Sequence, residues 1–215
     1  MPWIEQLQSA NWREGCCIFF GAYTLGCFTT GYYLLRWRKR QDIRALGSGS
    51  VGAKNVGRIM GWPGFLATVI GDSAKGALAV WAARLVSPDD NFAGLAMLAV
   101  VAGHVWPAQL RFRGGKGVAT SLGALVVCNP PLAVAFAVLF VIALAVLRKG
   151  VLPGLVAFAA LPLASMCLGQ DPATVVTTSL LAGLVLIAHR KNLLTGLWQF
   201  AQRPNLPAKH HPPEL

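Results

Sequence analysis

The chain has 215 residues, of which 55% are hydrophobic and only 13% are charged, and its mean hydropathy is +0.54. This composition excludes an ordinary water-soluble domain and indicates a protein that folds in a lipid bilayer. The net charge of +11 does not indicate a nucleic-acid partner, because the basic residues lie between long apolar runs and not on a soluble face.

The apolar runs predict an all-α, polytopic integral membrane bundle of about seven transmembrane helices. A helix needs roughly 20 apolar residues to cross the hydrocarbon core. The predicted spans are residues 16–35, 63–86, 92–106, 118–128, 130–147, 151–168 and 173–188. The third and fourth spans are short, so a re-entrant hairpin with only five full spans is an alternative.

The charges between the spans predict the orientation of the bundle. Basic residues follow the first, third, fifth and seventh spans, whereas the other connections hold Asp89, Asp90 and Asp171 and no lysine or arginine. The positive-inside rule then places the N-terminus outside and the C-terminus in the cytoplasm. Residues 1–200 are expected to form the transmembrane domain, and the proline-rich residues 201–215 a flexible cytoplasmic tail.

The first basic segment, residues 47–58, combines closely spaced glycines with hydroxyls and two cations. Glycine lets successive backbone N–H groups turn toward one point, and arginine adds directed hydrogen bonds, so the segment suits an oxyanion. It is not a Walker A loop, because Ala53 separates the glycine from Lys54 and Asn55 follows the lysine. A flexible, basic interface loop is the alternative interpretation.

Two opposite charges, Asp72 and Lys75, lie three residues apart inside the second span. Isolated charges in lipid are costly, so such a pair marks either a transport pathway or a mutually satisfied structural pair. We favour the structural pair, with the task of orienting neighbouring polar loops.

The second basic segment places Gly114, Gly115 and Gly117 around Lys116 at the expected N-terminus of a helix. Free N–H groups and the helix dipole favour a phosphate at such a site, and lysine adds a point charge. An ordinary positive-inside loop would not require three glycines around one lysine. His104, just before this segment, is either a general base or phosphate ligand, or an interfacial hydrogen-bonding side chain.

A third polar group follows the last span, where His189 and Asn192 are three residues apart and share a helix face. Both side chains are expected to reach the two basic segments. The five cysteines fall in apolar stretches and have no spacing with histidine that builds a zinc site, so neither a metal nor another cofactor is predicted.

Together these segments resemble the bacterial acyl-phosphate-dependent glycerol-3-phosphate acyltransferases, the PlsY family. The family's first motif resembles GSGNxGATNxxR, and this chain matches it at Ser48, Gly49, Gly52, Ala53, Asn55 and Arg58. The second motif, HxxP followed by GGKGVAT, is matched at His104, Pro107 and residues 114–120. Asp72, Lys75 and Gly76 are similar to DxxKG, and His189, Arg190 and Asn192 to HRENxxR. The chain departs from these patterns at Ser50, Lys54, Lys191 and Thr195.

The resemblance implies seven spans, a cytoplasmic active site and a multi-pass protein of the bacterial plasma (inner) membrane. It implies transfer of a fatty acyl group from acyl phosphate to the 1-hydroxyl of glycerol 3-phosphate, which yields lysophosphatidate for phospholipid biosynthesis. The residues expected to bind substrate phosphate are Gly47, Gly49, Gly52, Asn55, Arg58, Gly114, Gly115, Lys116 and Gly117. The residues expected to position the reacting groups are Ser48, His104, His189 and Asn192, supported by Asp72 and Lys75.

The activated donor needs no protein nucleophile, but two questions stay open at this point. The hydroxyl proton could pass to the leaving phosphate, or to His104 or His189 as a general base. The departures from the family pattern also leave a diverged inactive paralogue as an alternative, and the charged pair in the second span leaves a transporter of an organic phosphate. Oligomeric state and acyl-chain preference are not predicted.

Overall fold

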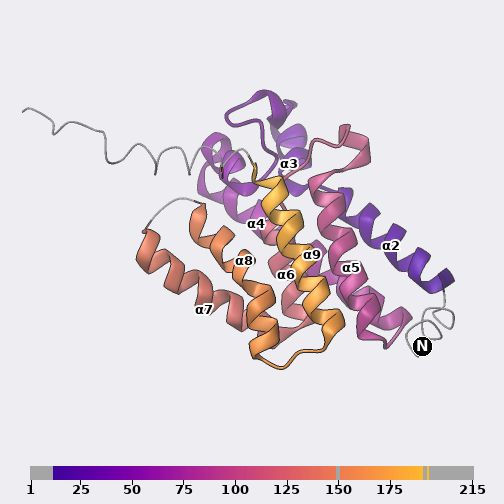
Figure 1. The fold of residues 1–215 in the computed structure, drawn as a ribbon. Helices are drawn as coiled ribbons and strands as arrows, with labels where there is room; N and C mark the ends of the chain where they lie inside the picture. Colours follow the sequence, from indigo (N-terminus) through magenta and orange to yellow (C-terminus); the bar gives the residue numbers. More distant parts are fainter. Residues whose placement is uncertain (1–11, 149–150, 191–192, 194–215) are drawn as a thin grey trace, which may run out of the picture.

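The computed structural model describes residues 12–148, 151–190 and 193, and the regular secondary structure in this part of the chain is entirely helical (Figure 1). The α-helices are α2 (Trp12–Cys27), α3 (Thr30–Lys39), α4 (Ala53–Val86), α5 (Asp90–Val105), α6 (Val118–Cys128), α7 (Pro130–Leu147), α8 (Leu152–Cys167) and α9 (Pro172–Ala188). Two 3₁₀ turns, η1 (Ile43–Ala45) and η2 (Ala108–Leu110), lie in the loops. Every predicted span is confirmed as helical, and the first is formed by α2 and α3 together.

The outer surface of the bundle is apolar where a lipid bilayer would surround it. Among the described residues, α4, the run Asp90–Leu110 and α7 are long and apolar enough to cross a membrane. α6, α8 and α9 are shorter apolar helices. Large hydrophobic side chains of α7 are exposed, among them Val134, Val138, Val141, Ile142 and Val146. Such a continuous apolar face is expected in lipid and not in water.

Two helices differ from the predicted spans. The first predicted span is divided, because the chain leaves helical geometry at Phe28 and Thr29 before α3 begins. α4 begins ten residues earlier than the predicted residue 63 and bends at Gly61, which has a φ of 71°. Pro63 follows two residues later, and a proline cannot donate the backbone hydrogen bond that would continue the first segment.

α6 is an 11-residue helix that packs closely against α4. At about 1.5 Å per residue it is roughly 17 Å long, well short of the hydrocarbon thickness. A Cβ atom on Gly76 would meet the carbonyl of Thr120, and one on Gly123 would meet the carbonyl of Ser73. Small residues on both helices therefore let the two backbones touch, which is the usual basis of helix association in lipid.

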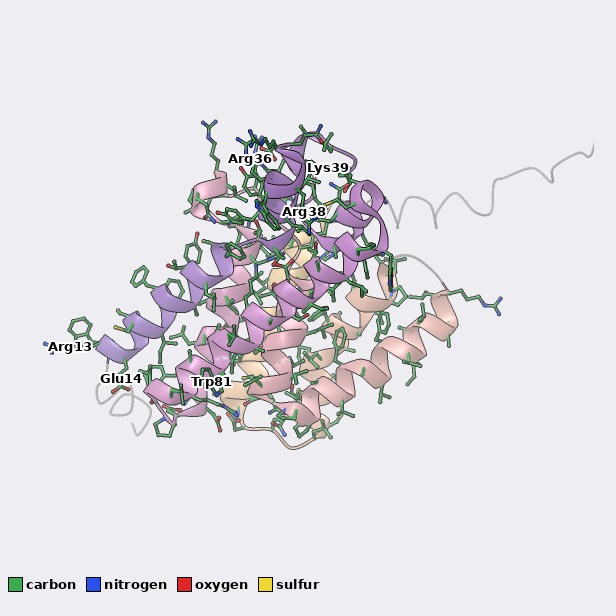
Figure 2. All side chains as sticks on the ribbon, turned by 180° about the vertical axis from the view of Figure 1, so that it is seen from behind. Arg13, Glu14, Arg36, Arg38, Lys39 and Trp81 are labelled. Atoms are coloured by element: carbon green, nitrogen blue, oxygen red, sulfur yellow. The ribbon has the colours of Figure 1, made fainter. Side chains whose placement is uncertain are left out.

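The polar connections gather at one end of the bundle. Figure 1 shows that α3, the loop after it, the loop after α5 and the last turn of α9 lie at the same end. Figure 2 shows the basic side chains Arg36, Arg38 and Lys39 of α3 at this end, and Arg13 and Glu14 at the far end of α2. The segments predicted to carry the chemistry are thus brought to one side of the molecule.

Candidate active site

The loop between α3 and α4 is held in one conformation by the side chain of Asn55. This side chain is buried, and its amide group donates to the carbonyls of Leu46 and Ser50 at 2.9 Å. Its oxygen accepts the backbone N–H of Ser48, also at 2.9 Å. Gly47 packs against this oxygen with a φ of 56°, where a Cβ atom would collide. The polar atoms of Asn55 thus shape the loop, whereas the sequence predicted that they bind phosphate.

This loop leads directly into the N-terminus of α4, at Gly52. The first N–H groups of a helix have no partner inside the helix, so they can bind an anion. The N–H of Gly52 donates to the hydroxyl of Ser50 at 3.3 Å. Lys54 and Arg58 follow in the first two turns of α4, one turn apart and both exposed. Ser48 is exposed at the same end.

The loop between α5 and α6 folds back onto the last turn of α5. The N–H of Gly114 donates to the carbonyl of Val105 at 3.1 Å, and the N–H of Gly115 to that of His104 at 3.0 Å. A Cβ atom on Gly114 would strike the carbonyl of His104, and one on Gly115 would strike the imidazole ring. Both amides are therefore used within the protein, and they support packing in place of the anion-binding nest that the sequence predicted.

Gly117 turns the chain into α6. It is the N-cap of this helix and has a φ of 79°, a conformation that favours glycine. Its α-carbon faces Val101 on α5, where a Cβ atom would approach to 2.9 Å. The half-buried Lys116 therefore stands directly before the free N–H groups of a helix N-terminus.

Cations from the two loops lie close enough to influence one another. Partial burial lowers the pKa of Lys116, and repulsion by Lys54 and Arg58 lowers it further. Burial also lowers the pKa of His189, and Lys116 and Lys54 add to that effect. These couplings link α4, the second loop and the end of α9. The described parts of the three predicted segments thus bring positive charge within electrostatic range, and an anionic ligand there would relieve the repulsion.

A buried polar network stabilises the break between α2 and α3. The ammonium group of Lys75 donates to two carbonyls at the end of α2, those of Gly26 at 3.0 Å and Phe28 at 2.7 Å. The carboxylate of Asp72 accepts the backbone N–H of Thr30, at the start of α3, at 3.2 Å. The predicted ion pair is present, with 3.1 Å between the charged atoms. A cation at a helix C-terminus and an anion at an N-terminus both match the helix dipoles.

His104 joins this network through its Nδ1 atom, which lies 2.8 Å from the Lys75 ammonium nitrogen. An ammonium group can only donate, so Nδ1 accepts and the ring proton resides on Nε2. Nε2 faces Gly115, at the edge of the second loop. In this tautomer Nε2 carries the proton and Nδ1 is engaged by Lys75, so neither nitrogen offers a free lone pair and the geometry favours a positioning role for His104 over that of a general base.

His189, which follows α9 directly, has the opposite arrangement. Its Nδ1 lies 2.9 Å from the carbonyl oxygen of Val185. Because a carbonyl only accepts, Nδ1 carries the proton and the Nε2 lone pair is left to accept another. The lowered pKa keeps the ring neutral near neutral pH. Its predicted neighbour Asn192 lies outside the described residues, as do Lys191, Thr195 and residues 201–215.

One contact at this end was missed by the reasoning from sequence. Arg44, one of the basic residues that follow the first span, pairs with Asp42 at 2.6 Å and donates to the carbonyl of Leu110 at 2.8 Å. It therefore joins the first loop to the second. The spacing of Asp42 and Arg44 could have suggested a local pair, but no sequence signal points to a carbonyl 66 residues away.

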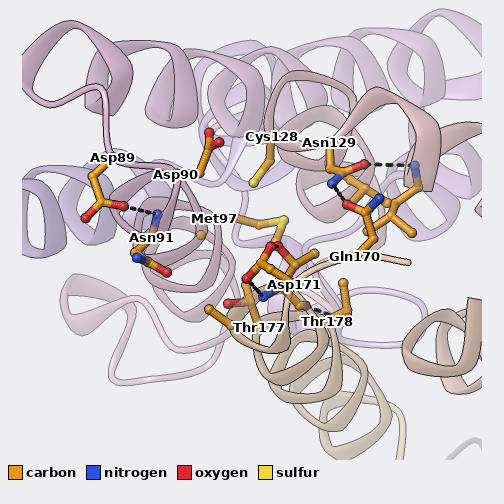
Figure 3. Close-up of a pocket in the computed structure, with 15 residues that line it drawn as sticks. Asp89, Asp90, Asn91, Met97, Cys128, Asn129, Gln170, Asp171, Thr177 and Thr178 are labelled. Atoms are coloured by element: carbon orange, nitrogen blue, oxygen red, sulfur yellow. Dashed lines mark hydrogen bonds between the residues drawn. The ribbon is translucent and has the colours of Figure 1, made fainter. Parts of the chain in front are cut away.

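The opposite end of the bundle holds a cavity of about 350 Å³ (Figure 3). Asp89, Asp90, Asn129, Gln170 and Asp171 line it, together with apolar residues of α5 and α6. None of the predicted site residues lies in its wall. Among residues 12–148, 151–190 and 193, no group of three histidine, cysteine or acidic side chains is arranged to hold a metal ion.

Comparison with known proteins identifies the family. The family model for glycerol-3-phosphate acyltransferase matches residues 16–198. A curated relative, glycerol-3-phosphate acyltransferase 1 of Desulfitobacterium hafniense (strain Y51), is 42% identical over 186 residues, covering 86% of this chain and 92% of the relative. The glycerol-3-phosphate acyltransferase of Jannaschia sp. (strain CCS1) is 41% identical over 172 residues, covering 80% and 84% of the two chains.

The fold is also that of a solved structure. The crystal structure of PlsY, an integral membrane glycerol 3-phosphate acyltransferase, in its glycerol 3-phosphate form matches with a TM-score of 0.77 and 29% identity. The match covers 85% of this chain and 92% of PlsY. The lysophosphatidic acid form matches with a TM-score of 0.74. The chain is thus an integral membrane protein and belongs to the PlsY family of glycerol-3-phosphate acyltransferases.

Proposed function

We propose that this protein transfers a fatty acyl group from acyl phosphate to the 1-hydroxyl of glycerol 3-phosphate and releases lysophosphatidate and inorganic phosphate. The observation that carries the proposal is the convergence of Lys54, Arg58 and Lys116 beside the N-termini of α4 and α6. Both substrates carry a phosphoryl group, and two helix N-termini with three cations suit two such groups held side by side. The relatives are named glycerol-3-phosphate acyltransferases, which supports the acceptor and the group transferred.

The reaction follows from holding these two anions close together. The glycerol oxygen attacks the acyl carbon, an ester C–O bond forms, and the bond from the acyl carbon to the phosphate oxygen breaks. The phosphate leaves with the electron pair, and nearby cations stabilise its charge. Acyl phosphate is already activated, so the protein contributes mainly orientation and electrostatic stabilisation.

The hydroxyl proton has two acceptors that fit the site. One is the leaving phosphate, whose oxygens can take up the proton as it departs as inorganic phosphate. The other is Nε2 of His189, since Nδ1 of this ring is bound to the Val185 carbonyl. His104 is unsuited in the observed network, because its Nδ1 faces the Lys75 ammonium group. We assign His104 to positioning, Arg58 and Lys116 to phosphate binding, and Ser48 and Asn192 to orientation of the acceptor.

In this proposal the cationic end faces the cytoplasm. There it meets the two negatively charged substrates. The connections at the opposite end hold Asp89, Asp90 and Asp171, in agreement with the positive-inside rule. The N-terminus then lies outside and the C-terminus inside the bacterial plasma membrane. Reporter fusions or cysteine labelling from each side of the membrane would test this orientation.

The decisive assay uses the purified full chain with acyl phosphate and glycerol 3-phosphate. We expect lysophosphatidate and inorganic phosphate in equal amounts, and no product when glycerol replaces glycerol 3-phosphate. No turnover with retained phosphate binding would instead identify an inactive paralogue. Uptake of labelled glycerol 3-phosphate into proteoliposomes without any acyl donor would identify a carrier. Either result would overturn the proposal.

A further inference from the structure

The two phosphate-binding loops come from distant parts of the sequence, so their separation must be set by contacts between them. The proposed reaction requires the two phosphoryl groups at one fixed distance, because small misplacements of reacting groups are costly to rate. The first loop is fixed internally by Asn55, through bonds to Leu46, Ser48 and Ser50. Its attachment to the second loop is made by a different residue, Arg44.

The guanidinium group of Arg44 is held rigidly before it reaches the second loop. Asp42 accepts from its Nε at 3.0 Å and from its Nη2 at 2.6 Å, which is a two-pronged carboxylate contact. The same carboxylate accepts the backbone N–H of Arg44 at 2.9 Å. The ring of Tyr32 lies 5.3 Å beneath the guanidinium carbon. These contacts leave Nη1 directed at the carbonyl of Leu110, 2.8 Å away.

The position of Leu110 determines where Lys116 lies. Leu110 ends η2 and is buried, and the next residues, Arg111 and Phe112, both have positive φ and reverse the chain. Three residues later Gly115 is bonded to the end of α5. The stretch that carries Lys116 is therefore anchored on both sides: before the reversal by Arg44, and by Gln109, which donates to the carbonyl of Cys27, and after it by α5.

We propose that Asp42 and Arg44 form a clamp that sets the spacing between the two phosphate-binding loops, so that Arg44 is a positioning residue for acyl transfer. The inference rests on the proposed function and adds to it a residue outside the predicted set. Charge alone cannot make this clamp. A lysine has no planar fork with which to satisfy Asp42 and the Leu110 carbonyl together.

Kinetics of four variants test the clamp. In Arg44→Gln, loss of a charged hydrogen bond should raise KM for both acyl phosphate and glycerol 3-phosphate about tenfold and lower kcat. Arg44→Lys should recover little of this loss, and Asp42→Asn should show a smaller change of the same kind. The matched control is Arg38→Gln, which removes an exposed arginine that stacks on Trp37, 5.0 Å from its ring, and should behave as wild type.

Two kinetic results would overturn the clamp. A change in KM for only one substrate would make Arg44 a direct ligand of that phosphate. Full recovery in Arg44→Lys would reduce its role to that of a point charge. Turnover by the wild-type protein tests the proposed function by itself. The clamp is tested by the KM and kcat of each variant relative to those of the wild type.

Limited trypsin digestion gives a readout that does not depend on turnover. Arg111 and Arg113 are exposed cleavage sites directly after the residue that Arg44 holds. Release of the clamp should speed cleavage there several-fold in Arg44→Gln and Asp42→Asn, because proteolysis follows local opening. Cleavage at the rate of Arg38→Gln in both variants would show that Arg44 does not hold the second loop, and would reject the proposal.

Discussion

The two ends of the bundle differ in how their charged side chains are placed relative to the helix dipoles. At the acidic end carboxylates cap helix N-termini. Asp89 accepts the N–H of Asn91 at the start of α5 at 2.9 Å, and Asp171 accepts that of Thr174 at the start of α9 at 3.0 Å. At the other end Lys54 lies in the first turn of α4 and Lys116 directly before α6, where a cation opposes the helix dipole. The acidic end therefore meets its helix dipoles with matching charge, whereas the cations at the other end oppose theirs, a mismatch that the proposed phosphate ligands would offset.

The largest effect should come from removing a cation of the active site. Lys116→Ala or Arg58→Ala should lower kcat/KM for acyl transfer by about 100-fold or more, because each loses a charged contact to a substrate phosphate. Thermal stability should fall little or rise, since repulsion is relieved. Rates measured with purified variants, beside melting curves, check both statements. Near-normal kcat/KM in either variant would contradict the proposed phosphate site.

The pH profile of kcat should separate the two proton acceptors. If His189 is the base, activity falls as pH drops through its pKa, which lies below the ordinary histidine value. His189→Gln should then lower kcat by about 10²-fold and remove this acid limb. An acid limb that persists in His189→Gln would assign proton transfer to the substrate phosphate. The measurement is kcat at saturating substrate in wild type and His189→Gln.

A smaller effect is expected at Lys54, where this chain departs from the family pattern. Lys54→Thr should raise KM for the phosphate substrates by roughly threefold to tenfold, with larger differences at low salt. Lys54 also lowers the pKa of Lys116, which must stay protonated to bind phosphate. Its removal should therefore raise that pKa and move the alkaline limb of activity to higher pH. An unchanged limb would place Lys54 outside the site.

The smallest catalytic effect is expected at the acidic end. Asp171→Ala removes the N-cap of α9 and should destabilise the protein by about 1 kcal/mol, with unchanged KM and kcat. Hydrogen bonds from Thr174 hold the pKa of Asp171 below its usual value. This contribution is present above the ordinary aspartate pKa and is lost as pH falls through the lowered one. A lower kcat for Asp171→Ala under conditions where the variant is fully folded would show that the acidic end also contributes to catalysis.

Much of the site could be read from the chain because local chemistry dictates it. The segment around Lys116 predicted a helix N-terminus, and Gly117 is the N-cap of α6 there, with a positive φ. The paired charges Asp72 and Lys75 predicted a buried ion pair, because either charge alone in lipid is costly. The roles of Asn55, Gly114 and Gly115 were not predictable, because their bonding partners belong to neighbouring backbone whose path only the fold defines.

The sequence by itself determined a helical membrane protein, the order of its apolar helical segments, and the family to which its motifs belong. Those properties follow from hydrophobic length and from local residue chemistry, which act within a few residues. The tertiary structure alone decided that α2 ends at Cys27, that Nδ1 of His104 faces Lys75 whereas Nδ1 of His189 faces the Val185 carbonyl, and that Arg44 binds Leu110. Each of these depends on contacts between residues far apart in the chain, which packing creates and local pattern cannot encode.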